Sequence, residues 1–178
     1  MFPELTTDRF RLREILPSDQ QKIFEGLSDK SVIKYYGVSY STFKEAGQQM
    51  DWYKNLIITQ TGIWWGICSK DNEEMVGACG FNNTGKEHKK TELGYWLLPH
   101  YWKQGIMIEV IPSIINYAFD VLALHRIEAT VEIDNLSSKK LLGKLGFKYE
   151  GTLKECEFKN EKFIDLDYYA LLNSSHNI

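Results

Sequence analysis

The sequence predicts an α/β fold, a sheet flanked by helices, and two kinds of pattern lead to this prediction. Runs rich in β-branched and aromatic residues, which are typical of strands, occur at 63–68, 75–81, 91–98 and 126–133. Between and around them lie stretches whose apolar residues recur at helical spacing. At 178 residues the chain has the size of one domain with a sizeable core, predicted to span residues 1–178.

The first half of the chain should contain a strand, two helices and a hairpin. Imperfect alternation predicts the strand over 5–13, and Ser18 or Asp19 should cap the helix that follows it. Thr42, with Glu45 three residues later, resembles a capping box and should open a longer helix. The two arms of a hairpin should follow at 63–68 and 75–81, and a loop at 82–90.

The second half should alternate strands and helices. Residues 91–98 form a predicted strand that stops at Pro99. Apolar spacing from Ile106 to about residue 118 predicts a helix, which Pro112 should kink or interrupt with an irregular turn. The remaining elements are a strand over 126–133, a short helix over 136–145 ending at Gly146, and strands over 147–151 and 163–172.

Three residues between the strand and the helix, Lys103-Gln104-Gly105, suggest a phosphate-binding turn. Because Gly105 has no Cβ, the backbone can come close to a ligand there. The first amides of a helix have no partner inside it and carry the positive end of its dipole, so they attract phosphate. The same pattern also occurs as a purely structural turn, and the residues alone leave both interpretations open.

This segment resembles the acetyl-CoA-binding segment of the GNAT acetyltransferases. The motif consists of Gly-Tyr-Trp-Leu at 94–97, Tyr-Trp at 101–102 and Gly-Ile-Met-x-Glu at 105–109. Together with Leu-x-Thr-x-Arg-x-x-Leu-Arg at 5–13, it is most similar to the Rim-type branch, the ribosomal-protein N-terminal acetyltransferases and their small-amine relatives. Against the general loop pattern Gln/Arg-x-x-Gly-x-Gly/Ala, Gly105 matches, whereas Trp102 and Met107 replace the first and last positions.

The resemblance covers nearly the whole chain and implies the GNAT fold. This is a mixed, mostly antiparallel, twisted sheet that is splayed at its centre and flanked by helices. It also implies acetyl-CoA as co-substrate, bound by backbone amides of the turn and the helix start. The residues expected at the cofactor are Lys103, Gln104, Gly105, Ile106, Met107 and Ile108.

A second motif, Asn-x-x-Ser followed by Lys-Leu-Gly-Phe, begins at Asn135. Its residues alone predict a capped amphipathic helix. By the family resemblance, Asn135 would hydrogen-bond the pantetheine arm of the cofactor and Ser138 would lie near the thiol sulfur. Many GNAT enzymes have a proton-donating tyrosine where this chain has Leu142, so that role would pass to Ser138 or to water.

Acetyl transfer to an amine requires a base, because an ammonium group cannot attack the thioester. Glu92, on the strand before the turn, is the candidate base, and the alternative is a strand carboxylate without a catalytic role. The acetyl carbonyl develops negative charge, which a backbone amide can stabilise. The expected donors are the amides of Leu97 or Leu98.

The composition limits which partners and which cellular location are expected for the chain. The net charge of -3 predicts no general attraction to nucleic acid or to an anionic membrane. Three cysteines without a CxxC pair and four histidines without ligand spacing predict neither a disulfide framework nor a metal site. No apolar run approaches the roughly 20 residues of a membrane span, so a soluble cytoplasmic protein is expected.

These features together predict an acetyl-CoA-dependent N-acetyltransferase that acts on a primary amine by direct transfer. The resemblance favours a protein N-terminal α-amine as acceptor, of the kind found on ribosomal proteins. Polyamines or aminoglycosides, and a non-catalytic acetyl-CoA-binding regulatory module, are the alternatives. The chain is also compatible with a homodimer. A dinucleotide-binding fold is disfavoured because Gly105 stands alone where that fingerprint needs three glycines.

Overall fold

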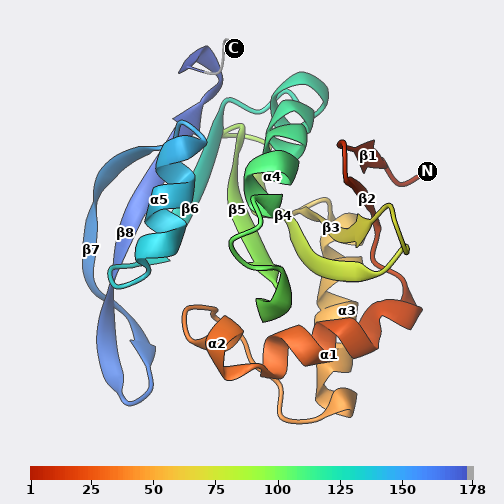
Figure 1. Ribbon diagram of the computed structural model, residues 1–178. Helices are drawn as coiled ribbons and strands as arrows, with labels where there is room; N and C mark the ends of the chain where they lie inside the picture. Colours follow the sequence, from red (N-terminus) through yellow and green to blue (C-terminus); the bar gives the residue numbers. More distant parts are fainter. Residues whose placement is uncertain (176–178) are drawn as a thin grey trace.

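The computed structural model describes residues 1–175, which form an eight-stranded sheet flanked by helices (Figure 1). The strand order is β1-β2-β3-β4-β5-β6-β8-β7. This is the mixed, mostly antiparallel architecture that the sequence predicted. The strands are β1 (Leu5–Thr6), β2 (Phe10–Glu14), β3 (Ile63–Ser69), β4 (Met75–Gly85), β5 (Lys90–Leu97), β6 (Arg126–Glu132), β7 (Lys148–Lys159) and β8 (Lys162–Leu172).

Two groups of helices cover the two faces of the sheet. The larger core cluster packs the helix α4 against one face, around Trp65 and Phe81. The second cluster packs α1 and α3 against the other face, around Trp64 and Trp96. Adjacent strand residues point to opposite faces, so the Trp64-Trp65 pair serves both cores. The helices are α1 (Gln20–Ser28), α2 (Lys30–Ile33), α3 (Phe43–Thr59), α4 (Ile106–Asn116) and α5 (Leu136–Lys144).

The sheet opens between β5 and β6, which are the one parallel pair among the strands of residues 1–175. Their register begins at Lys90 and Arg126 and ends at Glu92 and Glu128. Beyond that point the two strands diverge (Figure 1). The far half of β5 therefore has no strand partner on one side, which leaves backbone amides there without a partner in the sheet.

The start of α3 is as predicted, whereas the start of α1 has the predicted cap residue without its capping hydrogen bond. Thr42 Oγ1 accepts from the Glu45 amide at 3.2 Å, and the Glu45 carboxylate accepts from the Thr42 amide at 3.2 Å. Asp19 does occupy the N-cap position of α1, but its side chain makes no capping hydrogen bond to the helix. The Asp19 carboxylate instead accepts two hydrogen bonds from the Arg13 guanidinium, at 2.7 and 2.9 Å, and one from the Leu16 amide at 2.7 Å, so its oxygens are engaged before the helix.

Three strand boundaries differ from the prediction. Residues 5–13 do not form one strand, because the Thr7 amide donates to the Phe10 carbonyl at 2.9 Å and turns β1 back onto β2. β4 runs on to Gly85, into the predicted loop. β7 runs from Lys148 to Lys159, well beyond the predicted end at 151. Most of β7 is exposed on both faces, so its sequence lacks the alternation that marks a half-buried strand.

Pro112 does not end α4, which continues to Asn116. Proline has no amide hydrogen, so the Ile108 carbonyl loses its usual partner, and water can reach that half-exposed residue. An irregular π turn follows one turn later, at Tyr117–Val121. The predicted cap of α5 is confirmed, since Gly146 has φ 88°. No helix within residues 1–175 is long and apolar enough to cross a membrane. One of the four histidines, His176, lies outside the described residues.

Candidate active site at the opening of the sheet

A cavity of about 1270 Å³ lies where β5 and β6 diverge. It is lined by both strands, the turn before α4, the start of α5 and the segment that follows α2. Nine of the predicted site residues line it: Glu92, Leu97, Lys103, Gly105, Ile106, Met107, Ile108, Asn135 and Ser138. Leu98 and Gln104 do not line it.

The turn before α4 has an unusual backbone. Gly105 has φ 75°, and Lys103 has φ 61° although it carries a side chain. A non-glycine residue in this left-handed region is uncommon and often marks a functional turn. A Cβ built at Gly105 would have the Arg9 Nη2 atom as its nearest neighbour at 4.0 Å, so the space in front of the glycine is open.

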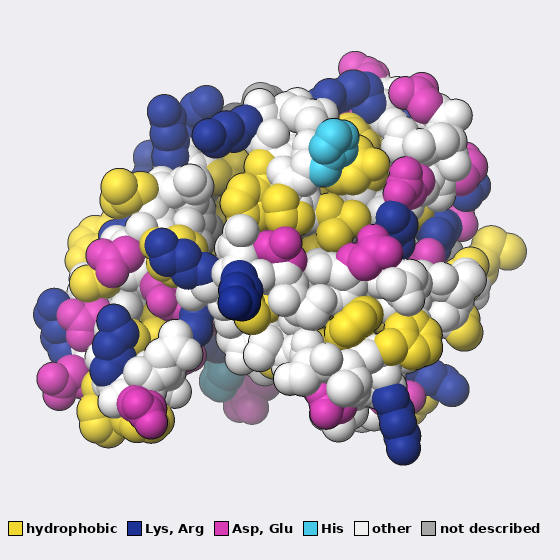
Figure 2. All heavy atoms as spheres, turned by 60° about the horizontal axis from the view of Figure 1, so that its bottom comes forward, with side chains coloured by type: hydrophobic (Ala, Val, Ile, Leu, Met, Phe, Trp, Pro, Cys, Tyr) yellow, Lys and Arg dark blue, Asp and Glu magenta, His cyan; other side chains and the backbone are white. Residues whose placement is uncertain are grey.

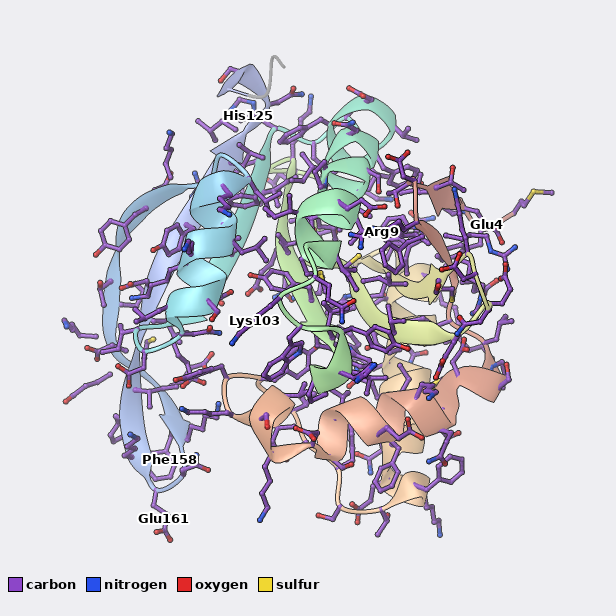
Figure 3. The ribbon with its side chains drawn as sticks, viewed as in Figure 1. Glu4, Arg9, Lys103, His125, Phe158 and Glu161 are labelled. Carbon is purple, nitrogen blue, oxygen red and sulfur yellow. The ribbon has the colours of Figure 1, made fainter. Side chains whose placement is uncertain are left out.

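The start of α4 presents its amides to this open space. Within the described residues, no side chain caps the helix at Gly105. The Met107 side chain is buried in the larger core cluster, so only the backbone at this position remains for a ligand. Lys103 extends from the turn into the gap between β5 and α5 (Figure 3). Unpaired amides, a helix dipole and one lysine fit the pyrophosphate of acetyl-CoA.

The structure distinguishes Leu97 from Leu98 as donors to an acetyl carbonyl. The Leu98 amide donates to the Val76 carbonyl at 3.0 Å and is therefore engaged within the sheet. Alternation along β5 directs the Leu97 amide away from β4, toward the opening. The Leu97 carbonyl accepts from the Trp102 indole at 2.8 Å, which fixes the orientation of the strand end. Of the two predicted donors, Leu97 is the one whose amide faces the cavity.

The helix α5 brings Asn135 and Ser138 to the other wall. Asn135 Oδ1 accepts from the Ser138 amide at 3.1 Å and caps the helix. This leaves the amide NH₂ of Asn135 for a ligand. Lys139 in the same helix forms an ion pair with the buried Asp167 of β8 at 2.5 Å, which holds α5 against the sheet.

Tyr95, which the sequence did not single out as a site residue, reaches Ser138 from β5. Its phenol hydroxyl and the Ser138 hydroxyl form a short hydrogen bond. Burial raises the pKa of Tyr95 to about 12, so the phenol is protonated and can donate near neutral pH. Leu142, at the family's tyrosine position, is fully buried in the core. A phenol therefore meets Ser138 from the strand rather than from the helix.

Glu92 lies on the opposite face of β5 from Tyr95, three residues apart along the strand. Its carboxylate accepts from three neutral side chains: Asn82 at 3.3 Å, Asn83 at 2.8 Å and Thr130 at 3.0 Å. These donors come from β4 and β6, on both sides of β5. They orient the carboxylate, and among residues 1–175 no lysine or arginine forms an ion pair with it, an arrangement that suits a proton acceptor.

The β7–β8 hairpin closes the cavity on the side of α2. Lys159 Nζ donates to the Lys34 carbonyl at 2.7 Å and forms an ion pair with Glu132. In Figure 1 the hairpin descends beside α2. The cavity therefore has two sides: one is made by the α4 turn and α5, where acetyl-CoA is expected, and the other is made by Glu92, the α2 segment and this hairpin, which leaves it for the acceptor. We call them the cofactor side and the acceptor side.

Sequence reasoning missed several of these residues, and for two different reasons. Tyr95 stands within the recognised Gly-Tyr-Trp-Leu motif, so its position was visible but its contact was not. Asn82, Asn83 and Thr130 stand outside every motif. They are brought to Glu92 only by the register of β4 and β6 beside β5.

Comparison with known proteins identifies the family and the fold. The sequence profile of the acetyltransferase (GNAT) domain matches residues 9–148. The uncharacterized N-acetyltransferase YoaA of Bacillus subtilis is 36% identical over 173 residues, which cover 97% of this chain and 98% of that protein. The ribosomal-protein-serine acetyltransferase of Escherichia coli is 29% identical over 121 residues, 68% of each chain.

Two solved structures with bound coenzyme A share the fold. One is RimL, a ribosomal L7/L12 α-N-protein acetyltransferase, with a TM-score of 0.85 and 21% identity over 96% of this chain and 98% of that one. The other is the spermidine N-acetyltransferase of Vibrio cholerae with coenzyme A and spermine, with a TM-score of 0.83 and 21% identity over 94% of this chain and 97% of that one.

Proposed function

The chain belongs to the GNAT acetyltransferase family and is an N-acetyltransferase, and from this premise we propose that its acceptor is the N-terminal α-amine of a peptide or protein. The observation that carries the proposal is the carboxylate of Glu92, held in the cavity by three neutral donors. The similarity to the ribosomal-protein-serine acetyltransferase supports the Rim-type branch and makes a ribosomal protein the preferred acceptor.

The acidity of the amine favours this acceptor. A peptide α-amine has a reference pKa of about 7.7–8.0, against about 10.4 for a lysine-type primary amine. Near neutral pH a substantial fraction of an α-amine is already deprotonated. One carboxylate that takes the proton directly or through water is then sufficient.

The charges of the cavity point in the same direction. Its lysines are Lys30, Lys34, Lys103 and Lys159, and its carboxylates are Glu92, Glu132 and Glu157. Glu132 is already paired with Lys159. A polyamine or an aminoglycoside carries several positive charges and requires an excess of carboxylates, whereas a peptide terminus does not. Acidic and basic side chains are also intermixed over the face seen in Figure 2, without one acidic area.

The roles of the residues follow from the two sides of the cavity. The amine enters on the acceptor side in its neutral form, and Glu92 takes one of the two protons on its nitrogen as the carbon–nitrogen bond forms and passes it to water. Nitrogen attacks the thioester carbon, and the Leu97 amide donates to the carbonyl oxygen as it becomes negative. When the carbon–sulfur bond breaks, Ser138 donates a proton to the thiolate. Tyr95, protonated and bonded to Ser138, replaces that proton and is reprotonated from water.

An acceptor panel tests this proposal, with release of free thiol from acetyl-CoA as the readout. It compares a short peptide with a free N-terminus, the same peptide Nα-blocked but containing lysine, spermidine and an aminoglycoside. We expect the free α-amine peptide to have a kcat/KM at least about tenfold above the others, in line with the amine pKa difference. A higher kcat/KM for spermidine or the aminoglycoside would overturn the proposal.

A further inference from the structure

The first turn of the chain is joined to α4 by a cluster of hydrogen bonds on Glu109. Thr7 Oγ1 and the Arg9 amide donate to Glu109 Oε1 at 2.6 and 2.8 Å. Arg9 Nε donates to Glu109 Oε2 at 2.6 Å. Both carboxylate oxygens are thus occupied by residues about 100 positions away in the sequence. In Figure 3 the Arg9 side chain lies between the first strands and α4.

Glu109 stands close to the amides that are expected to bind phosphate. It is the fourth residue of α4, and its own amide donates to the Gly105 carbonyl at 3.1 Å. A carboxylate in the first turn of a helix is attracted to the unpaired amides and to the positive end of the dipole. An unrestrained Glu109 would therefore compete with a phosphate group for the same amides, and its charge would repel that phosphate.

The contacts with Thr7 and Arg9 keep the carboxylate in place and ionised. Burial opposes ionisation of Glu109, but the hydrogen bonds from Thr7 and Arg9 outweigh it, and its pKa is lowered. The side chain is 20% exposed, so the ion pair with Arg9 is partly shielded from water.

Arg9 also touches the turn itself. Its Nη2 atom donates to the Gln104 carbonyl at 3.1 Å, next to the glycine. The same atom is the nearest neighbour of the open position at Gly105. The Arg9 side chain therefore holds both the Gln104 carbonyl, directly before Gly105, and the Glu109 carboxylate, four residues after it.

We propose that Thr7 and Arg9 are positioning residues that hold Glu109 away from the amides of the α4 turn and so keep this turn free for the pyrophosphate of acetyl-CoA. The proposal rests on the proposed cofactor turn. It assigns a role to Thr7 and Arg9 of the N-terminal motif and to the glutamate of the Gly-Ile-Met-x-Glu motif. Arg9 acts on the cofactor site through Glu109 and not as a ligand.

Calorimetric titration with coenzyme A tests this without any acceptor. Arg9→Ala releases Glu109, and we expect a Kd about five- to tenfold higher, as expected for one charge at a helix end. In the double variant Arg9→Ala/Glu109→Gln the competing charge is absent, so the Kd should return to within about twofold of wild type. Arg11→Ala is the matched control, because Arg11 lies two residues further along the chain, in β2, and pairs with Glu73 instead.

Each outcome supports or overturns the proposal. If Arg9→Ala binds like wild type, or if the double variant binds as weakly as Arg9→Ala, the competition does not exist. If Arg9→Ala fails to fold, as judged by its thermal unfolding, Thr7→Val removes one of the bonds to Glu109 and is expected to weaken binding in the same direction. Failure of wild type to bind coenzyme A would overturn the cofactor turn itself, whereas failure of the rescue overturns only the role of Arg9.

Discussion

The cofactor side and the acceptor side of the cavity present different chemical groups to a ligand. The cofactor side uses consecutive residues and backbone amides, from Lys103 to Ile108, at the start of one helix. The acceptor side depends on the Glu92 carboxylate, whose three hydrogen-bond donors come from two neighbouring strands. The hairpin that closes it is anchored by Lys159, which contacts Lys34, directly after α2, and Glu132 in β6.

This difference teaches which changes each side tolerates. A site made of backbone amides keeps its donors whatever the side chains are, and it is damaged chiefly where a new Cβ or a new charge enters it. A site made of side chains loses its chemistry when one group is replaced. Substitutions should therefore affect rate on the acceptor side and affinity on the cofactor side.

The largest effect is expected for Glu92→Gln. The amide keeps the size of the side chain but cannot take a proton, so kcat/KM near neutral pH should fall on the order of 1000-fold. The defect should shrink at high pH, where all of the amine is neutral and hydroxide can take the proton that Glu92 otherwise accepts. Steady-state rates from pH 6 to 10 measure this, with Glu157→Gln, an exposed carboxylate of the same cavity, as control. An unchanged rate and pH profile would make Glu92 an ordinary strand carboxylate.

A smaller loss of rate is expected when the hydrogen bond between Tyr95 and Ser138 is removed. Ser138→Ala should lower kcat on the order of 100-fold with little change in acetyl-CoA affinity. Tyr95→Phe should lower kcat less, and the double variant should be no slower than Ser138→Ala, because the two hydroxyls act as one unit. Since the pKa of Tyr95 is about 12, the wild-type rate should not lose this donor between pH 7 and 10.

Two results would contradict this assignment. A loss below about threefold in Ser138→Ala would indicate that water protonates the thiolate, given the usual size of general-acid effects. Additive losses in the double variant would separate the two hydroxyls.

The smallest of the three effects is expected for Gly105→Val, and it should appear in affinity. The valine must adopt φ 75° and places its side chain in the open space of the turn. We expect coenzyme A affinity to fall by more than about tenfold while kcat at saturation changes less. Calorimetry on a variant with normal thermal unfolding measures this, and Gly85→Val, at a glycine with open space around it, is the control. An unchanged affinity would show that this turn does not bind the phosphate groups of coenzyme A.

The sequence by itself determined most of the cofactor side. A glycine turn, a helix start and a capped helix at Asn135 are local features, because each depends on residues close together in the chain. The capping box of α3 and the arms of the central hairpin are local for the same reason. The local patterns gave the wrong length for some strands. An example is β7, whose length is set by its pairing with β8.

Only the tertiary structure decided the contacts across the sheet. The choice of Leu97 over Leu98 depends on which strand lies on each side of β5. Tyr95 contacts Ser138, which is 43 positions away in the sequence, and Arg9 contacts Glu109, which is 100 positions away. No periodicity in a single sequence specifies such pairs, because they follow from strand order and from how α4 and α5 pack on the opened sheet.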